Sequence, residues 1–269
     1  MRKLSLLLVF CFSLNILLQA NSNKDSTAVV CTVIKHGLKD TRDLVLSPIK
    51  WKCNEWITAG GVTLATGALI AWGDQTVYDF SNTLHNNTTD FLGKIIQPMG
   101  NYYPISAIAG FFTYGLLAKD NYSLETSLIA AESIFLSTCM VQSVKYLAGR
   151  VRPNDFGTSN PHQWQGPFTG DYSFYSGHTT AVFSVASVFA YRYRDVSWVP
   201  FLCYGLAALG GMERIFDNRH WASDVLLGAA IGTANGIFLC KCWEKSPIKF
   251  FPVVSTDRAQ LSVIIPINK

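Results

Sequence analysis

The chain has 269 residues, of which 49% are hydrophobic and 15% are charged, and its formal net charge is +4. Soluble domains carry about 25% charged residues, so this composition favours a helical membrane protein. The small, dispersed positive charge argues against a nucleic-acid partner, and the sequence has neither a glycine-rich nucleotide loop nor a CxxC zinc spacing.

The N-terminus has the layout of a secretory signal: a basic start, an apolar stretch and a small residue at Ala20. Residues 1–20 are expected to be a signal peptide cleaved after Ala20 or, alternatively, an uncleaved anchor. Residues 21–53 are polar and basic, and they form a separate segment ahead of the core.

Six apolar stretches follow, and each is too long for a strand and lacks strict alternation, which predicts helices. They are Trp56–Gly73, Tyr102–Ala118, Leu124–Val144, His178–Tyr191, Val196–Met212 and Val225–Cys240. Several are shorter than the ~20 residues that span a bilayer, but their small residues suit close packing of membrane helices. A tightly packed soluble bundle is the alternative.

The fold class expected is therefore all-α, a six-helix transmembrane bundle at residues 54–245. The polar segment between the first two apolar stretches is amphipathic and expected to lie at the membrane interface. The tail, residues 246–269, has β-branched runs around a polar turn, which predicts a small β-hairpin.

Three polar clusters interrupt the apolar stretches. In "KYLAGRVRP", Lys145 and Arg152 are seven residues apart, which predicts two helical turns on one face, with Pro153 ending the helix. In "YSGH", Ser176 is expected to cap the next helix, so that His178 lies in its first turn beside unpaired backbone N–H groups. That arrangement suits an anion.

The third cluster is "ERIFDNRHWASD", in which Arg214 precedes His220 by six residues and Asp224 follows it by four. His220 and Asp224 share a helix face if the helix begins near His220. In an up-down bundle the three clusters lie at the same end. Three cations, two histidines, a carboxylate and a helix N-terminus would together make a pocket for phosphate.

The pattern Lys-x6-Arg-Pro, then Ser-Gly-His, then Arg-x5-His-x3-Asp resembles the type 2 phosphatidic acid phosphatase (PAP2) superfamily. That family also includes class A bacterial acid phosphatases and vanadium haloperoxidases, and the resemblance covers residues 55–243. Two positions depart from its pattern: Tyr175 stands where the family usually has proline, and Glu213 where it usually has serine.

The resemblance implies a role for each matching residue. The phosphate-binding set would be Lys145, Arg152, Ser176, Gly177 and Arg214. His220 would attack phosphorus to form a phosphohistidine, Asp224 would orient it, and His178 would protonate the leaving oxygen. No metal or other cofactor is implied, and Arg150 and Arg219 are expected only to give electrostatic support or to face solvent.

The function implied is metal-independent hydrolysis of a lipid-linked phosphate or pyrophosphate, such as phosphatidic acid, phosphatidylglycerol phosphate, undecaprenyl pyrophosphate or a lipid A phosphate. The alternatives are a secreted acid phosphatase with soluble substrates, a vanadate-dependent haloperoxidase and a non-catalytic lipid-phosphate carrier. The expected partners are the lipid phosphate and membrane lipids, and the oligomeric state is open.

Two signals on membrane orientation conflict. Basic residues such as Lys119, Arg192 and Lys241 gather at the end opposite the motifs, so the positive-inside rule places the site outside the cytoplasm. A signal peptide reverses this, because residue 21 would then be outside and the motifs would face the cytoplasm. The broad charge bias favours a bacterial inner-membrane protein with its site facing the periplasm.

Overall fold

The computed structural model describes residues 35, 37–154, 160–169, 173–246, 249–255 and 258–264. The signal segment expected at residues 1–20 lies outside these residues. Residues 37–45 are helical and lead through a 3-10 turn, Ser47–Lys50, into the core.

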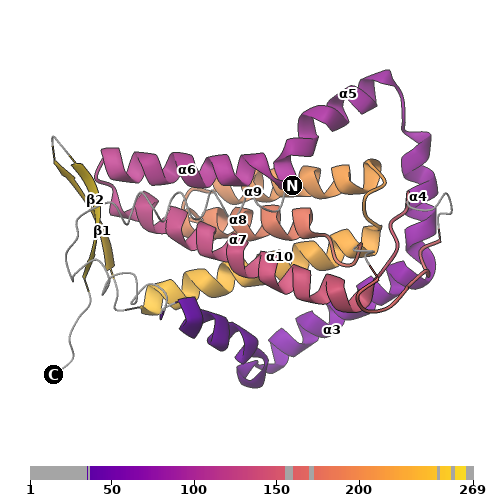
Figure 1. The fold of residues 1–269 in the computed structure, drawn as a ribbon, viewed down its shortest axis with the longest axis horizontal. Helices are drawn as coiled ribbons and strands as arrows, with labels where there is room; N and C mark the ends of the chain where they lie inside the picture. The colour runs from indigo at the N-terminus through magenta and orange to yellow at the C-terminus, as the bar shows by residue number, and fades with distance from the viewer. Residues whose placement is uncertain are drawn as a thin grey trace.

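Every apolar stretch is helical, as the sequence predicts. The helices are α3 (Cys53–Ala68), α4 (Asp74–Thr83), α5 (Asn87–Ile96), α6 (Tyr102–Leu117), α7 (Asn121–Ala148), α8 (Gly177–Arg192), α9 (Trp198–Phe216) and α10 (Ala222–Lys245). A π-helical turn, Leu69–Gly73, joins α3 to α4. In Figure 1, α6 to α10 form an elongated bundle, α3 runs obliquely along it, and α4 stands across one end.

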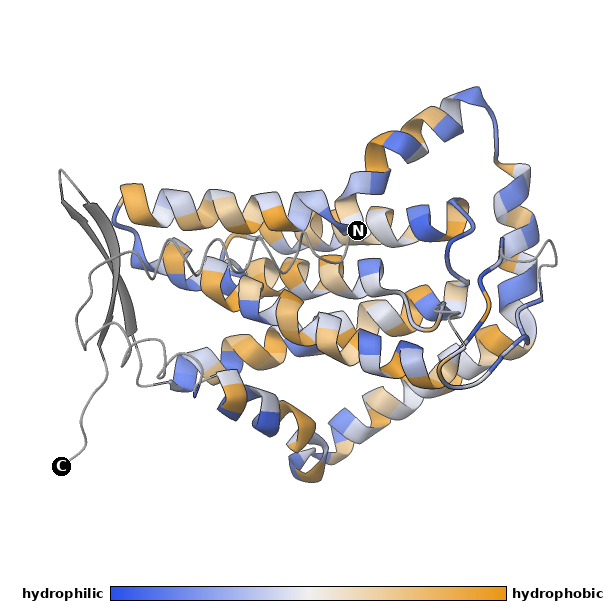
Figure 2. Cartoon of the chain, viewed as in Figure 1, coloured by the Kyte–Doolittle hydropathy of each residue, from blue (hydrophilic) through white to orange (hydrophobic). Residues whose placement is uncertain are grey.

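Among the described residues, four helical segments are long and apolar enough to cross a membrane: Cys53–Thr83, Asn121–Ala148, Trp198–Phe216 and Ala222–Lys245. The last part of the first segment, α4, is mostly hydrophilic (Figure 2). Large apolar side chains such as Trp56, Leu64 and Phe201 remain more than half exposed, as expected where lipid replaces water. The chain is therefore a membrane protein built on an all-α bundle.

Close packing of α8 on α10 depends on glycines spaced four residues apart. A Cβ at Gly228 would lie 2.8 Å from the carbonyl oxygen of Ser176, and one at Gly236 would lie 2.5 Å from that of Ser184. Between them, a Cβ at Gly232 would overlap the carbonyl oxygen of Thr180. Glycine lets the two backbones approach closely, as in other membrane helix pairs, and this fixes where α8 and α10 begin relative to one another.

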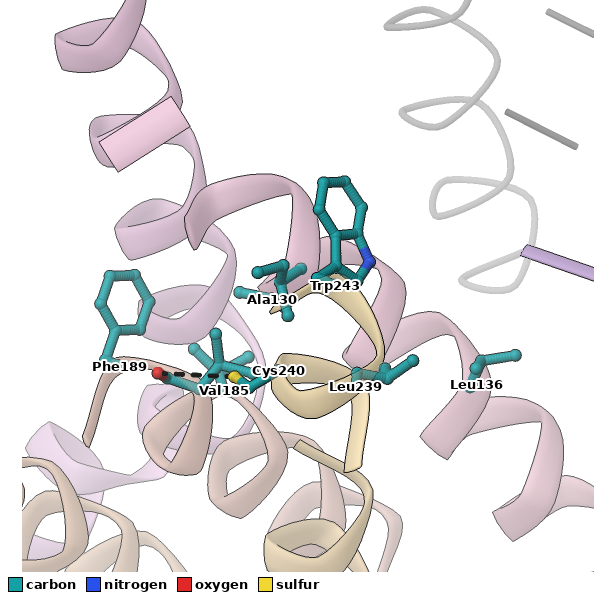
Figure 3. Close-up of a cluster of buried hydrophobic side chains, with 9 residues drawn as sticks. Ala130, Leu136, Val185, Phe189, Leu239, Cys240 and Trp243 are labelled. Atoms are coloured by element: carbon teal, nitrogen blue, oxygen red, sulfur yellow. Dashed lines mark hydrogen bonds between the residues drawn. The ribbon is translucent and has the colours of Figure 1, made fainter. Parts of the chain in front are cut away.

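The main apolar cluster lies where α7, α8 and α10 meet (Figure 3). Its buried members are Ile129, Ala130, Leu136, Val185, Val188, Phe189, Leu239, Cys240 and Trp243. Trp243 also donates its indole N–H to Oε2 of Glu132 at 2.7 Å. This cluster holds together the three helices that carry four of the eight predicted site residues, Lys145, Gly177, His178 and Asp224.

The C-terminal tail forms the predicted hairpin. Strand β1 (Lys249–Ser255) pairs antiparallel with β2 (Arg258–Ile264), in a register that sets Lys249 opposite Ile264 and Ser255 opposite Arg258. The hairpin lies at the opposite end of the bundle from α4 (Figure 1).

The end of α7 corrects one prediction. The helix ends at Ala148, because Gly149 adopts the left-handed conformation (φ +59°) that commonly terminates helices. A Cβ at Gly149 would overlap the carbonyl oxygen of Gly166, so the turn also brings the following loop against the helix end. Arg152 therefore lies beyond the helix, not two turns along its face from Lys145, and Pro153 does not end it.

Candidate active site

The three polar clusters meet at the end of the bundle beside α4. Lys145 lies in the last turn of α7 and is buried, and Gly177 opens α8 beside it. A Cβ at Gly177 would lie 3.9 Å from Cε of Lys145. His220 lies in the turn that joins α9 to α10, and the charges of Lys145 and Arg152 act on it directly.

Ser176 caps α8, as predicted. Its hydroxyl accepts a hydrogen bond from the hydroxyl of Thr179 at 2.9 Å and a longer one from the Thr179 N–H at 3.4 Å. Its own backbone N–H donates to the carbonyl oxygen of Asp224 at 3.1 Å. The start of α8 is thereby joined to the start of α10.

His220 and Asp224 face each other, but not through a shared helix face, because α10 begins only at Ala222. Asp224 is the third residue of α10, and its Oδ2 turns back to accept the N–H of Trp221 at 3.0 Å, as in a capping box. Nδ1 of His220 lies 3.6 Å from the same oxygen and has no hydrogen-bond partner among the described residues. This distance is too long for a hydrogen bond, and it leaves Nε2 directed away from Asp224.

Arg150 gives electrostatic support, one of the two alternatives expected for it, and does not face solvent; its connection to Asp224 was not predicted. Its side chain is fully buried, and its Nη1 donates to Oδ1 of Asp224 at 2.6 Å while its Nη2 donates to Oδ2 of Asp74 at 2.6 Å. We call Asp74, Arg150 and Asp224 the Arg150 cluster. The glycine before Arg150 was the available signal in the sequence. A helix that ends at Gly149 leaves Arg150 outside the helix, so helical spacing no longer predicts where its side chain points.

A second group of charges, the cation cluster, consists of Lys145, Arg152 and Arg214. All three lie close enough to His178 for their charges to act on its imidazole. Nε of Arg152 is buried without a hydrogen-bond partner among the described residues. Arg214 forms an ion pair with its neighbour Glu213, one of the two positions that depart from the family pattern. An anion with several oxygens would suit such a group of donors.

Burial and these charges keep both histidines neutral. Burial first, and then the charges of Arg214, His220, Lys145 and Arg152, lower the pKa of His178 to about 3. Burial lowers the pKa of His220 to about 4, with Asp224 opposing the shift. A neutral His220 has a lone pair available for attack. A dianion bound among the cations would raise the pKa of His178, so that it could carry a proton.

Gly100 limits the space around the His178 side chain. A Cβ at Gly100, in the 3-10 turn before α6, would lie 2.6 Å from Cδ2 and 2.8 Å from Cβ of His178. Tyr175 is 1% exposed, and burial raises its pKa to about 12. Arg219 is exposed and pairs with Asp217 at 3.0 Å, as its lack of an assigned role suggested.

Within the described ranges, no group of three or more His, Cys, Asp and Glu side chains has an arrangement that could hold a metal ion. The site's positive charge comes from arginine and lysine, whose side chains bind phosphate oxygens.

Comparison with known proteins identifies similar sequences. Residues 126–248 match the sequence model of the PAP2 superfamily. A lipid A 1-phosphatase of Porphyromonas gingivalis is 40% identical over 98 residues, which cover 36% of this chain and 19% of that protein's length. The rat phospholipid phosphatase 1 is 23% identical, with 77% of this chain and 75% of that protein covered.

Two solved structures are also similar. The crystal structure of Aquifex aeolicus LpxE has a TM-score of 0.48 and 23% identity, and it covers 62% of this chain and 94% of that one. The PAP2-type phosphatidylglycerolphosphate phosphatase of Bacillus subtilis has a TM-score of 0.49 and 19% identity, with coverage of 68% and 92%.

Proposed function

The chain carries a domain of the PAP2 superfamily at residues 126–248, and from this premise we propose that it is a metal-independent phosphatase acting on a lipid-linked phosphate or pyrophosphate. The observation that carries the proposal is the meeting of two neutral histidines, the buried His220 and the half-buried His178, with the cation cluster at one end of the bundle. Binding an anion needs the cations alone, whereas an imidazole facing a carboxylate is suited to attack.

In the first step, the cation cluster, the hydroxyl of Ser176 and the N–H of Gly177 bind the phosphate oxygens. Nε2 of His220 forms a bond to phosphorus while the bond between phosphorus and the leaving oxygen breaks. The leaving oxygen takes a proton from His178, whose pKa the bound dianion raises. Asp224 faces Nδ1 of His220 at 3.6 Å and stabilises the positive charge that develops on the ring.

In the second step, water attacks the phosphohistidine. His178, now neutral, takes a proton from that water as the new phosphorus–oxygen bond forms. The bond between phosphorus and Nε2 of His220 breaks, and the ring returns to its starting state. Inorganic phosphate leaves, and both histidines are restored.

A lipid substrate is supported by the apolar surface close to the site. Helix α5 contacts the 3-10 turn that carries Gly100 and the C-terminal part of α9, and its Phe91, Leu92 and Ile95 are about half exposed or more. Such a surface suits the acyl–headgroup boundary of a bilayer. The substrates named for the relatives, lipid A and phospholipid phosphates, are of this type.

We place the protein in the bacterial inner membrane with the site facing the periplasm. Basic residues at the far end of the bundle support this orientation, because Lys119 follows α6 and Arg192 ends α8. A protease site inserted at Asn154, near the motifs, should be cut by protease added to spheroplasts, whereas one at Asp195 should be cut only after lysis. The reverse pattern would show that the site faces the cytoplasm.

The activity is tested by phosphate release from phosphatidic acid, phosphatidylglycerol phosphate, undecaprenyl pyrophosphate and lipid A in detergent with a chelator present. Wild-type protein and His162→Ala, a change of an exposed histidine, should release phosphate from at least one lipid. His220→Ala should release none. Release only from soluble phosphomonoesters would favour an acid phosphatase, and lipid binding without turnover in all three proteins would favour a carrier.

A further inference from the structure

Asp74 is a buried carboxylate that comes from outside the segment matched to the family. It is the first residue of α4, directly after the π-helical turn Leu69–Gly73, and is 1% exposed. Oδ1 accepts the backbone N–H of Ser223 at 2.8 Å, and Oδ2 accepts the hydroxyl of Ser223 at 2.6 Å. Asp74 thus holds the first turn of α10. This turn begins two residues after His220 and contains Asp224.

Arg150 connects this carboxylate to the proposed catalytic pair. Nη1 donates to both Asp224 at 2.6 Å and the hydroxyl of Ser223 at 2.7 Å, while Nη2 donates to Asp74 at 2.6 Å. The guanidinium also lies 5.0 Å from the centre of the Trp164 ring and 5.5 Å from that of Trp221. Charge-assisted hydrogen bonds of this length, between fully buried groups, allow little freedom of orientation.

The charges of the Arg150 cluster do not cancel. One guanidinium faces two carboxylates, so the cluster has a net charge of −1 when all three groups are ionised. It lies on the Nδ1 side of His220, opposite the direction of attack. Without Asp74 the net charge would be zero, and Arg150 would act on Asp224 alone, drawing its negative charge away from the imidazole.

We propose that Asp74 is a positioning residue of the active site: through Arg150 it fixes Asp224 and keeps a net negative charge behind His220. The proposal rests on the phosphohistidine function above, because in that mechanism the negative charge stabilises a cationic phosphohistidine ring. It assigns a part in the reaction to the helical segment Cys53–Thr83, which packs on the family domain from outside it.

Several other groups bear on the charge of His220 and must be held constant in a test. They are Asp224 of α10, Lys145 of α7, Arg152 of the loop after α7, and His178 of α8. A change at Asp74 leaves all of these charges in place. Its effect on His220 must then pass through the Arg150 cluster or through Ser223, which Asp74 also binds.

The test compares Asp74→Asn with Asp74→Glu and with Asp79→Asn, which alters an exposed carboxylate of the same helix. Two quantities are measured in full-length protein in detergent. The first is kcat and KM for phosphate release. The second is the titration midpoint of His220, followed by ¹⁵N-histidine NMR and assigned by the signal lost in His220→Gln. With five histidines in the chain, this assignment is direct.

We expect Asp74→Asn to lower kcat about tenfold with little change in KM, the size of effect seen when orienting partners are removed. Because a negative charge is lost, the midpoint of His220 should fall by roughly half a pH unit or more. Asp74→Glu should keep the wild-type midpoint although its kcat falls, and Asp79→Asn should match wild type in both. If the Asn variant does not fold, the Glu variant alone gives the test through its lowered kcat and unchanged midpoint.

An unchanged His220 midpoint and kcat in Asp74→Asn would overturn the proposal, and so would equal shifts of the midpoint in the Asn and Glu variants. The NMR readout does not need turnover. If wild-type protein releases no phosphate while Asp74→Asn still shifts the midpoint of His220, the phosphatase function is wrong but the coupling of Asp74 to His220 is supported.

Discussion

Glu213 and Arg214, adjacent residues in the last turns of α9, form an ion pair inside the protein, with side chains 4% and 5% exposed. Adjacent helical side chains normally point in different directions, so both must turn to meet. Oε2 of Glu213 accepts a hydrogen bond from Nε of Arg214 and forms the ion pair with its Nη2. If Arg214 binds phosphate, as we propose, Glu213 competes with that phosphate for the guanidinium.

Glu213→Gln should strengthen phosphate binding, because a neutral amide holds the guanidinium less tightly than a carboxylate. We expect inhibition by inorganic phosphate to become several-fold stronger and KM for the lipid phosphate to fall, a gain of about 1 kcal/mol. Stability should fall, since Arg214 is left with a weaker buried partner. Inhibition constants measured for the two proteins at one pH and ionic strength test this.

The matched control is Asp217→Asn, which breaks the exposed pair with Arg219 a few residues further on. An exposed pair contributes little, so the phosphate inhibition constant should stay at its wild-type value. Weaker inhibition in Glu213→Gln would contradict competition and would mean that Glu213 holds Arg214 in its binding position.

Gly100→Ala should impair proton donation by His178. The new Cβ would lie within 3.0 Å of three atoms of the histidine side chain, so the imidazole must move. Activity on a lipid phosphate, whose alkoxide needs a proton, should fall at least tenfold. Activity on p-nitrophenyl phosphate should fall less, because its leaving group needs no proton.

The control is Gly110→Ala in α6, where no described atom lies within 4 Å of the added Cβ; it should leave both rates unchanged. An equal loss of activity on both substrates in Gly100→Ala would count against His178 as the proton donor.

The sequence predicted the helices well because each apolar stretch is a single, strongly hydrophobic signal. It also predicted that the three polar clusters meet, since the order of the helices decides which end each cluster occupies. The local geometry was harder to predict. Pro153 is a strong helix breaker, yet Gly149 ends the helix four residues earlier because the incoming loop packs against it.

The role of Arg150 could not be read from spacing. Its partner Asp74 is 76 residues away in the sequence. The orientation of Asp74 depends on the π-helical turn before it, which adds a residue and rotates the helix that follows. Neither helical periodicity nor a motif reports such a turn. The roles of the individual site residues remain predictions, to be tested by the variants described here.

Gly232→Val should destabilise the protein more than any change at an exposed glycine. Its side chain would overlap the backbone of α8 at Thr180 and approach the N–H of Ser184, neither of which can move without separating α8 from α10. Overpacking of this kind costs about 1–3 kcal/mol or more. Thermal unfolding in detergent should show a lower Tm for Gly232→Val. Gly205→Val in α9, where the described structure leaves open space around the new Cβ, should keep the wild-type Tm.

Acid should destabilise the protein through the buried His220. The pKa of His220 is about 4 in the folded protein and 6.5 in an ordinary environment, so the unfolded chain binds more protons between these values. Stability is then complete above pH 6.5 and falls as the pH drops towards 4. From pH 7 to pH 5, where carboxylates titrate little, protonation of His220 alone should lower the free energy of unfolding by about 2 kcal/mol.

The test is Tm measured at pH 7, 6 and 5. It should fall steeply in wild type and in His162→Gln, an exposed control, and less steeply in His220→Gln. Equal slopes in all three proteins would mean that His220 is not held neutral by burial.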